Sequence, residues 1–132
     1  MIGDGMGLSQ ITTGMYANGN KTSLEEFDYI GLSKTHSLDY LVTDSAASGT
    51  AMASGIKTLN RTVGIDENNN KQKNILEICK EKNYNVGLVV TSEIVHATPA
   101  CFYANVPSRY DYEDIALQLS CLLYTSDAAD DS

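Results

Sequence analysis

Apolar and polar residues follow two different periods along this chain. A helical period is clearest between Asn74 and Lys82, where apolar side chains recur three and four positions apart among Lys and Glu. The same reasoning predicts helices for five segments, at 9–17, 45–56, 74–82, 98–104 and 111–120. Apolar and β-branched runs predict strands at the start of the chain and at 27–35, 40–42 and 86–94.

These elements alternate along the chain as strand, helix, strand, helix. Such alternation is typical of an α/β fold in which helices flank a mostly parallel sheet. Ligands bind such sheets at the carboxyl ends of the strands. The residues that follow the predicted strands are Asp4, the pair Asp44 and Ser45, and a segment that contains His96 and Thr98. The topology therefore predicts that these five side chains gather along one edge of the sheet.

Two interpretations of Asp44 and Ser45 are open. In the first, Asp44 caps the helix that follows and Ser45 fills its first turn, because Asp and Ser are common at helix starts. In the second, Ser45 is a nucleophile, whose hydroxyl needs a base or a metal to become reactive. No Gly-x-Ser-x-Gly motif surrounds Ser45, so a hydrolase triad is poorly supported. The neighbouring carboxylate instead favours activation by a divalent cation.

The other candidates also have structural interpretations. Asp4 lies between two glycines, where aspartate often bonds to turn amides. Thr98 precedes Pro99 and suits a helix cap. His96 near a helix start is more often a hydrogen-bonding residue than a metal ligand. Arg109 is by default a surface residue, and its functional interpretation is a planar fork for two phosphate oxygens.

Composition and charge limit the classes of function. The chain has 132 residues, 42% of them hydrophobic, and a net charge of −8. So acidic a chain lacks the basic face that nucleic-acid binding requires. An anionic substrate would need a metal or a local arginine to reverse the field. Three cysteines, Cys79, Cys101 and Cys121, have no metal-ligand spacing. No apolar run is long enough to span a membrane, and no signal-peptide pattern is visible.

Three long blocks resemble the alkaline phosphatase family. They are "IGDGMG" at 2–7, "VTDSAASGTAMASGIKT" at 42–58 and "HATPACFYANVPSR" at 96–109. Their order and length make the resemblance specific. It implies an alkaline-phosphatase-like fold, of which this chain holds an incomplete part, and hydrolysis of phosphate monoesters through a phosphoseryl intermediate.

The resemblance also implies roles for individual residues. Ser45 is the expected nucleophile, and Arg109 the expected grip on phosphate oxygens. The expected cofactors are two zinc ions and one magnesium ion. Asp44 matches a zinc ligand beside Ser45, and Asp4 matches a carboxylate that bridges the second zinc and the magnesium. Thr98 matches a hydroxyl near the magnesium. Position 96 varies in the family between Asp and His, so an indirect role beside the magnesium is expected for His96.

The resemblance further predicts the organisation of the chain. Residues 1–120 are expected to be the N-terminal portion of an alkaline phosphatase domain. Residues 121–132 are expected to be a disordered, non-native tail, because "CLLYTSDAAD" looks like translated sequencing adapter. The remaining metal ligands of the family are missing, and the chain has only two histidines. The isolated chain is therefore expected to be inactive, whereas its full-length parent is expected to be a homodimer that is periplasmic, secreted or displayed on the cell surface.

Two alternatives to a phosphomonoesterase remain. One is a related metal-dependent sulfatase or phosphomutase, against which the small residues after Ser45 and the presence of Arg109 argue. The other is a non-catalytic module that binds anions or metals. Tight binding without turnover would indicate the module.

Overall fold

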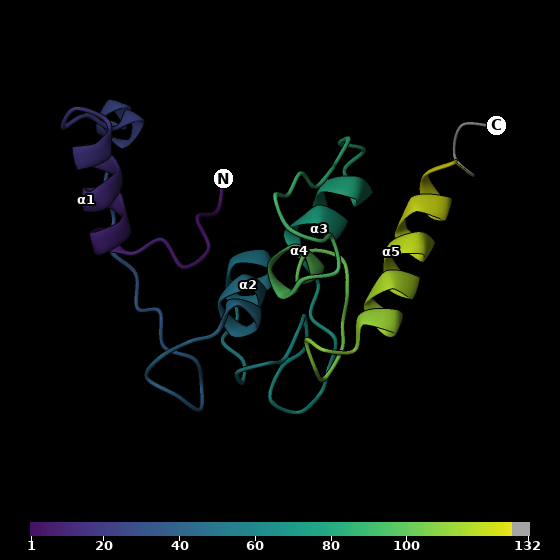
Figure 1. Ribbon diagram of the computed structural model, residues 1–132. Coiled ribbons are helices and arrows are strands. Elements are labelled where there is room, and N and C mark those ends of the chain that lie inside the picture. Colours follow the sequence, from purple (N-terminus) through teal and green to yellow (C-terminus); the bar gives the residue numbers. More distant parts are fainter. Residues whose placement is uncertain (128–132) are drawn as a thin grey trace. The chain divides into compact units, whose positions relative to one another are not determined.

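A computed structural model of the chain describes the backbone of residues 1–127 and the side chains of residues 1–121 (Figure 1). The chain divides into two compact units, Met1–Lys34 and a second unit that begins at Thr35. Among the residues described, no helix has the length and apolar character that crossing a membrane requires.

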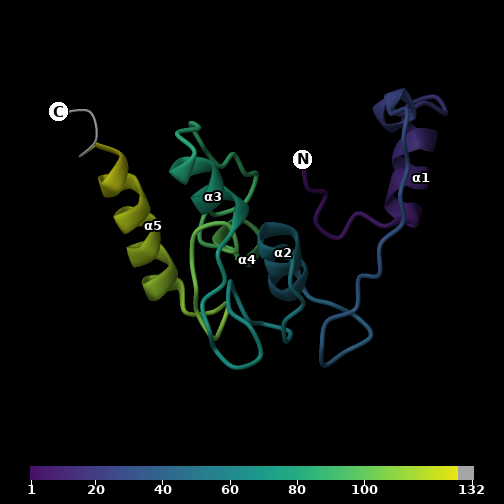
Figure 2. The same cartoon turned by 180° about the vertical axis from the view of Figure 1, so that it is seen from behind.

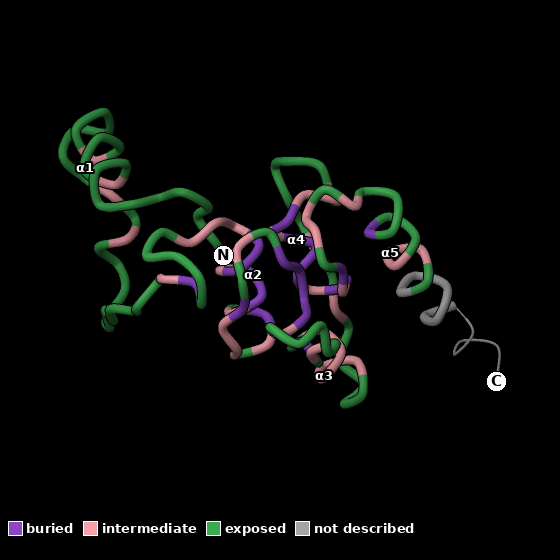
Figure 3. The backbone as a smooth tube through the Cα atoms, turned by 90° about the horizontal axis from the view of Figure 1, so that it is seen from below, coloured by how far each residue is buried: buried purple, intermediate pink, exposed green. Residues whose placement is uncertain are grey.

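The first unit consists of helix α1, Leu8–Ala17, and a short 3₁₀ helix η1, Ser23–Glu26. Both helices form where the local sequence favours a helix. Helix α1 confirms the predicted helix at 9–17. The Thr22 hydroxyl accepts a hydrogen bond from the Leu24 amide at 3.3 Å, and the Glu25 carboxylate accepts one from the Thr22 amide at 3.0 Å. No residue of Met1–Lys34 is buried, as the colours along α1 show (Figure 3).

Within its described part, 35–127, the second unit holds four helices, seen from two sides in Figures 1 and 2: α2 Ser45–Ser54, α3 Ile75–Glu81, α4 Ala97–Ala100 and α5 Tyr112–Asp127. Helix α2 packs against α4 and α3. Small residues allow the close approach of α2 and α4. A Cβ atom added at Gly49 would lie 2.9 Å from the Cys101 sulfur, so glycine at this position lets the two segments meet.

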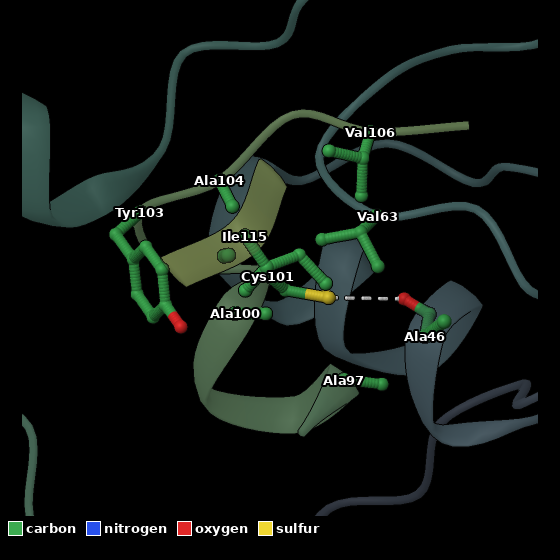
Figure 4. Close-up of a cluster of buried hydrophobic side chains, with 10 residues drawn as sticks. Ala46, Val63, Ala97, Ala100, Cys101, Tyr103, Ala104, Val106 and Ile115 are labelled. Atoms are coloured by element: carbon green, nitrogen blue, oxygen red, sulfur yellow. Dashed lines mark hydrogen bonds between the residues drawn. The ribbon is translucent and has the colours of Figure 1, made fainter. Parts of the chain in front are cut away.

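A small apolar core lies between these helices (Figure 4). The Cys101 thiol donates a hydrogen bond to the Ala46 carbonyl at 3.2 Å and so joins the segment after α4 to the first turn of α2. Val63 and Val106 form an isolated antiparallel bridge with hydrogen bonds of 3.1 and 2.9 Å. The fully buried Ile115 brings α5 onto the same core.

The predicted sheet is not formed in this structure. Residues 1–127 contain no strand, and their β structure consists of two isolated bridges, Val63 with Val106 and Ile65 with Lys71. The strands predicted at the start of the chain and at 27–35, 40–42 and 86–94 are therefore wrong for this chain. The physical reason is the lack of neighbours: a strand is maintained by hydrogen bonds to an adjacent strand. Leu41 and Val89 are almost completely exposed instead of packed.

The predicted helices are confirmed, with shifted ends. The segment predicted at 98–104 forms α4 at Ala97–Ala100, and its N-cap residue is His96, so the prediction that Thr98 caps this helix is wrong. Helix α5 extends through Asp127, past the domain boundary predicted at residue 120. That boundary stays a prediction. The rest of the predicted tail, 128–132, lies outside the described residues.

Candidate active site

The site begins at the first turn of α2. Asp44 is the N-cap residue, with φ −95° and ψ 176°, and its Oδ1 atom accepts a hydrogen bond from the Ala47 amide at 2.9 Å. Ser45 is the first residue of the helix and is half-buried. The cap that the sequence predicts is therefore present. The same turn places the Ser45 side chain at the positive end of a ten-residue helix.

Arg109 reaches this turn from a distant part of the chain. Its Nη1 atom lies 3.1 Å from Asp44 Oδ2, and the two side chains are 25% and 22% exposed. The Arg109 amide donates to the Arg61 carbonyl at 2.7 Å, which fixes its backbone. Its guanidinium carbon also lies 5.9 Å from the centre of the Tyr110 ring. The structure thus brings together Asp44, Ser45 and Arg109, three of the predicted site residues.

Both oxygens of Asp44 are engaged by protein donors. While Oδ1 caps α2, Oδ2 accepts from the Arg61 amide at 3.0 Å as well as from Arg109. The carboxylate therefore connects a helix start, a loop and an arginine. This arrangement orients the guanidinium toward the start of α2.

Thr98 lies on α4, which packs against α2, and His96 is the N-cap residue of that helix. The His96 Nε2 atom is 3.4 Å from Glu93 Oε2, and its ring centre is 6.4 Å from that of Tyr112. Thr98 is half-buried in the short helix. Its Cα atom would lie 3.6 Å from a Cβ added at Gly49, so the backbone at Thr98 closely approaches α2.

Asp4 belongs to the first unit. It lies in an exposed turn in which the Met6 amide donates to the Gly3 carbonyl at 3.3 Å, and Gly5 adopts a positive φ of 66°. The turn interpretation of "GDG" is therefore confirmed. The predicted convergence of Asp4 with Asp44 and Ser45 stays a prediction.

The residues that the structure describes do not complete a metal site. Among them, no group of three or more His, Cys, Asp or Glu side chains is arranged to hold a metal ion. A structural zinc ion takes four ligands, and a catalytic one takes three protein ligands. The donor set around Ser45 thus does not fit a complete zinc or magnesium centre, and the metal roles of Asp4, Asp44, His96 and Thr98 stay predictions.

A buried thiol lies directly behind the serine turn. Cys101 is fully buried, and its sulfur lies 3.2 Å from the Ala46 carbonyl oxygen and 3.4 Å from Thr50 Oγ1. Burial raises the pKa of this thiol to about 11. Cys101 therefore stays protonated at neutral pH and contributes to the packing of the core.

Two contact residues were not predicted from the sequence. Asn60 and Arg61 lie in a polar loop, 16 and 17 positions from Asp44, and both hydrogen-bond to it. Neither belongs to a motif or a periodic pattern. The one unusual feature is that Arg61 adopts a positive φ of 71°, which the residue type does not reveal.

Comparison with known proteins identifies the family. The alkaline phosphatase family model matches residues 1–131. Alkaline phosphatase 4 of Bacillus subtilis is 47% identical over 125 residues, which cover 88% of this chain and 27% of the relative. The alkaline phosphatase of Escherichia coli K12 is 39% identical, over 92% of this chain and 28% of the relative. This chain therefore belongs to the alkaline phosphatase family, and it spans about a quarter of the length of these relatives.

Solved structures agree with this assignment. The alkaline phosphatase of the Antarctic bacterium TAB5 superposes with a TM-score of 0.84 at 43% identity, over 87% of this chain and 34% of that one. A variant of the same enzyme, in which a histidine is replaced by aspartate, has magnesium bound in its M3 site. The described backbone thus follows the path of the matching part of an alkaline phosphatase, although its sheet is not formed.

Proposed function

We propose that this chain forms the phosphate-binding and nucleophile-bearing part of an enzyme that hydrolyses phosphate monoesters. The observation that carries the proposal is the ion pair between Asp44 and Arg109 beside Ser45 at the start of α2. Membership of the alkaline phosphatase family supports it. Ser45 is the proposed nucleophile, which forms a phosphoseryl intermediate.

The local geometry suits an anionic phosphoryl group. The N-terminus of α2 carries partial positive charge, which favours an anion next to Ser45. Arg109 has five N–H donors, and Asp44 accepts from its Nη1 atom. The other N–H groups of the guanidinium are enough to bind two phosphate oxygens. Asp44 restrains the guanidinium, so less conformational entropy is lost when the phosphate binds.

The role of Asp44 follows from its contacts. A carboxylate that receives three hydrogen bonds from Ala47, Arg61 and Arg109 is well suited to orient Arg109. We therefore favour this orienting role over the zinc-ligand role that the resemblance predicts for Asp44.

The metal centre is proposed to depend on further residues. We propose that two zinc ions and one magnesium ion bind with ligands from the part of alkaline phosphatases that this chain does not span. Asp4, Thr98 and, indirectly, His96 would contribute from this chain. The 132 residues by themselves are then inactive. We also propose that segments 40–42 and 86–94 become strands of the family's parallel sheet when that further sequence is present.

Family membership supports two additional proposals. The complete enzyme is a homodimer, and it acts in the periplasm, outside the cell or on the cell surface. Phosphate monoesters are its substrates.

The test uses the natural reading frame that contains this sequence. The purified enzyme is expected to hydrolyse p-nitrophenyl phosphate in the presence of zinc and magnesium, and to incorporate phosphate at Ser45. Ser45→Ala is expected to abolish the hydrolysis and the labelling, whereas Ser23→Ala, a change of an exposed serine in η1, is expected to leave both unchanged. Phosphate labelling of another residue would contradict the assignment. Tight phosphate binding without turnover would indicate a binding module instead, and preferential turnover of sulfate esters would indicate a sulfatase.

A further inference from the structure

The side chain of Asn60 bonds to the backbone on both sides of Thr43. Its Oδ1 atom accepts a hydrogen bond from the Asp44 amide at 3.0 Å, and its Nδ2 atom donates to the Val42 carbonyl at 3.1 Å. One planar amide group therefore closes the turn that leads into Ser45. The Asn60 backbone is itself fixed, because its amide donates to Asp39 Oδ1 at 2.9 Å.

The next residue extends this connection to Arg109. The Arg61 amide donates to Asp44 Oδ2 at 3.0 Å, and the Arg61 carbonyl accepts from the Arg109 amide at 2.7 Å. Arg61 makes these two contacts in a left-handed conformation, with φ 71°. Left-handed backbone at a residue other than glycine is unfavourable and persists where the surroundings impose it. The short loop Asn60–Arg61 thus contacts the backbone before Ser45, the Asp44 carboxylate and the backbone of Arg109.

These contacts fix groups that the helix does not fix. The amide of an N-cap residue and the carbonyl two positions before it have no partner within the helix that they precede. Asn60 supplies a donor and an acceptor at the required spacing. Asp at this position would supply two acceptors and lose the donor.

We propose that Asn60 is a positioning residue of the alkaline phosphatase site, which sets the turn that carries Ser45 and holds it in register with Arg109. The inference rests on the proposed function, because it assigns Asn60 a role in the reaction of Ser45. Asn60 acts through the backbone of Val42 and Asp44 and does not touch the substrate.

The experiment compares Asn60→Ala, Asn60→Asp and Asn68→Ala in the natural reading frame that contains this sequence. Asn68 is an exposed asparagine in the loop that follows, and it serves as the matched control. Initial rates with p-nitrophenyl phosphate, inhibition by inorganic phosphate and thermal unfolding are measured for each variant. Asn60→Ala removes both side-chain hydrogen bonds to the turn before Ser45 and is expected to lower kcat about tenfold. Asn60→Asp, which keeps the acceptor for the Asp44 amide, is expected to recover part of that loss.

A second measurement does not depend on activity. Amide hydrogen exchange resolved to Asp44 is expected to accelerate about tenfold in Asn60→Ala and to stay unchanged in Asn68→Ala. Unchanged exchange at Asp44 would overturn the proposal. Faster exchange with kcat unchanged per folded molecule would also overturn it, since Asn60 would then be merely structural. If the unsubstituted enzyme shows no turnover and no labelling of Ser45, the proposed function fails, and the reaction role of Asn60 fails with it.

Discussion

The carboxylate of Asp44 contacts the guanidinium of Arg109 at 3.1 Å, although 65 positions separate the two residues in the sequence. The same carboxylate caps helix α2 through its other oxygen. Capping and ion pairing are therefore compatible functions of one side chain. Asp44 is thus both the cap of α2 and the ion-pair partner of Arg109.

Two substitutions of Asp44 separate these functions. Asn is as good a cap as Asp, but it lacks the charge that holds Arg109. We expect Asp44→Asn to raise KM and the inhibition constant for phosphate about fivefold, a loss of about 1 kcal/mol, with a smaller change in kcat. Asp44→Ala is expected to show the same kinetic change and to lower the free energy of unfolding by about 1 kcal/mol more, because the cap is lost as well. Steady-state kinetics and urea unfolding of both variants measure the two effects. Equal stability of the two variants would contradict the capping role.

The exposed Arg61 offers a stabilising substitution. Its φ of 71° is costly for a residue with a Cβ atom, whereas glycine adopts it freely. Arg61→Gly is expected to increase the free energy of unfolding by about 0.5–1 kcal/mol, since relief of strain exceeds the added entropy of the unfolded chain. Arg61→Ala keeps the Cβ and is expected to bring no such gain. A gain of equal size in both variants, measured by urea unfolding, would show that the side chain and not the backbone conformation is the cause.

Gly64 is expected to be intolerant of any side chain. Its φ is 65°, and an added Cβ would lie 2.1 Å from the Ala104 carbonyl oxygen and 2.6 Å from Asn105 Nδ2. The backbone would have to move, which disrupts the adjacent bridge between Val63 and Val106. Gly64→Ala is expected to reduce the free energy of unfolding by about 3 kcal/mol or more. Thermal unfolding measures this loss of stability. Gly87→Ala is the control, because a Cβ added at Gly87 meets nothing within 4 Å. Similar losses at both positions would refute the steric explanation.

The parts of the fold that local chemistry determines were predictable. Asn74 and Glu77 bond reciprocally at the start of α3, and Asp44 caps α2, so both helices begin where the sequence places a capping residue. Helix ends were less certain, because packing decides them. At α4 the chain leaves the helix after Ala100, where Cys101 turns into the core.

The sheet and the long-range contacts were not predictable in the same way. The apolar runs at 40–42 and 86–94 have strand composition, yet a strand requires a neighbour, and composition does not reveal whether one is present. The loop Asn60–Arg61 is polar and has no motif, so its contacts with Asp44 arise purely from tertiary packing. Family resemblance predicts site roles for Ser45 and Arg109 but gives no sign of Asn60.

The buried thiol of Cys101 predicts how stability changes at alkaline pH. Burial raises the pKa of Cys101 to about 11 in the folded state, above its ordinary value of 9.0. The folded state therefore holds this proton more tightly than the unfolded state. The resulting stability is fully present below about pH 9 and is lost as pH rises through about 11, by roughly 2 kcal/mol. Tyr103, whose pKa burial raises to about 12 from 10.0, adds a loss of the same sign at higher pH.

Urea unfolding between pH 8 and pH 11 tests whether Cys101 causes this loss of stability at alkaline pH. The unsubstituted chain is expected to lose stability steadily above pH 9. Cys101→Ala is expected to be less stable at pH 8, because a packed side chain is removed, but to show a flatter decline up to pH 11. Cys79→Ala is the matched control and is expected to keep the steep decline, since Cys79 is only partly buried. If the free energy of unfolding falls as steeply with pH in Cys101→Ala as in the unsubstituted chain, another group causes the alkaline loss of stability. Iodoacetamide provides an independent check: at pH 8 the exposed Cys121 is expected to react, while Cys101 stays unmodified until the chain unfolds.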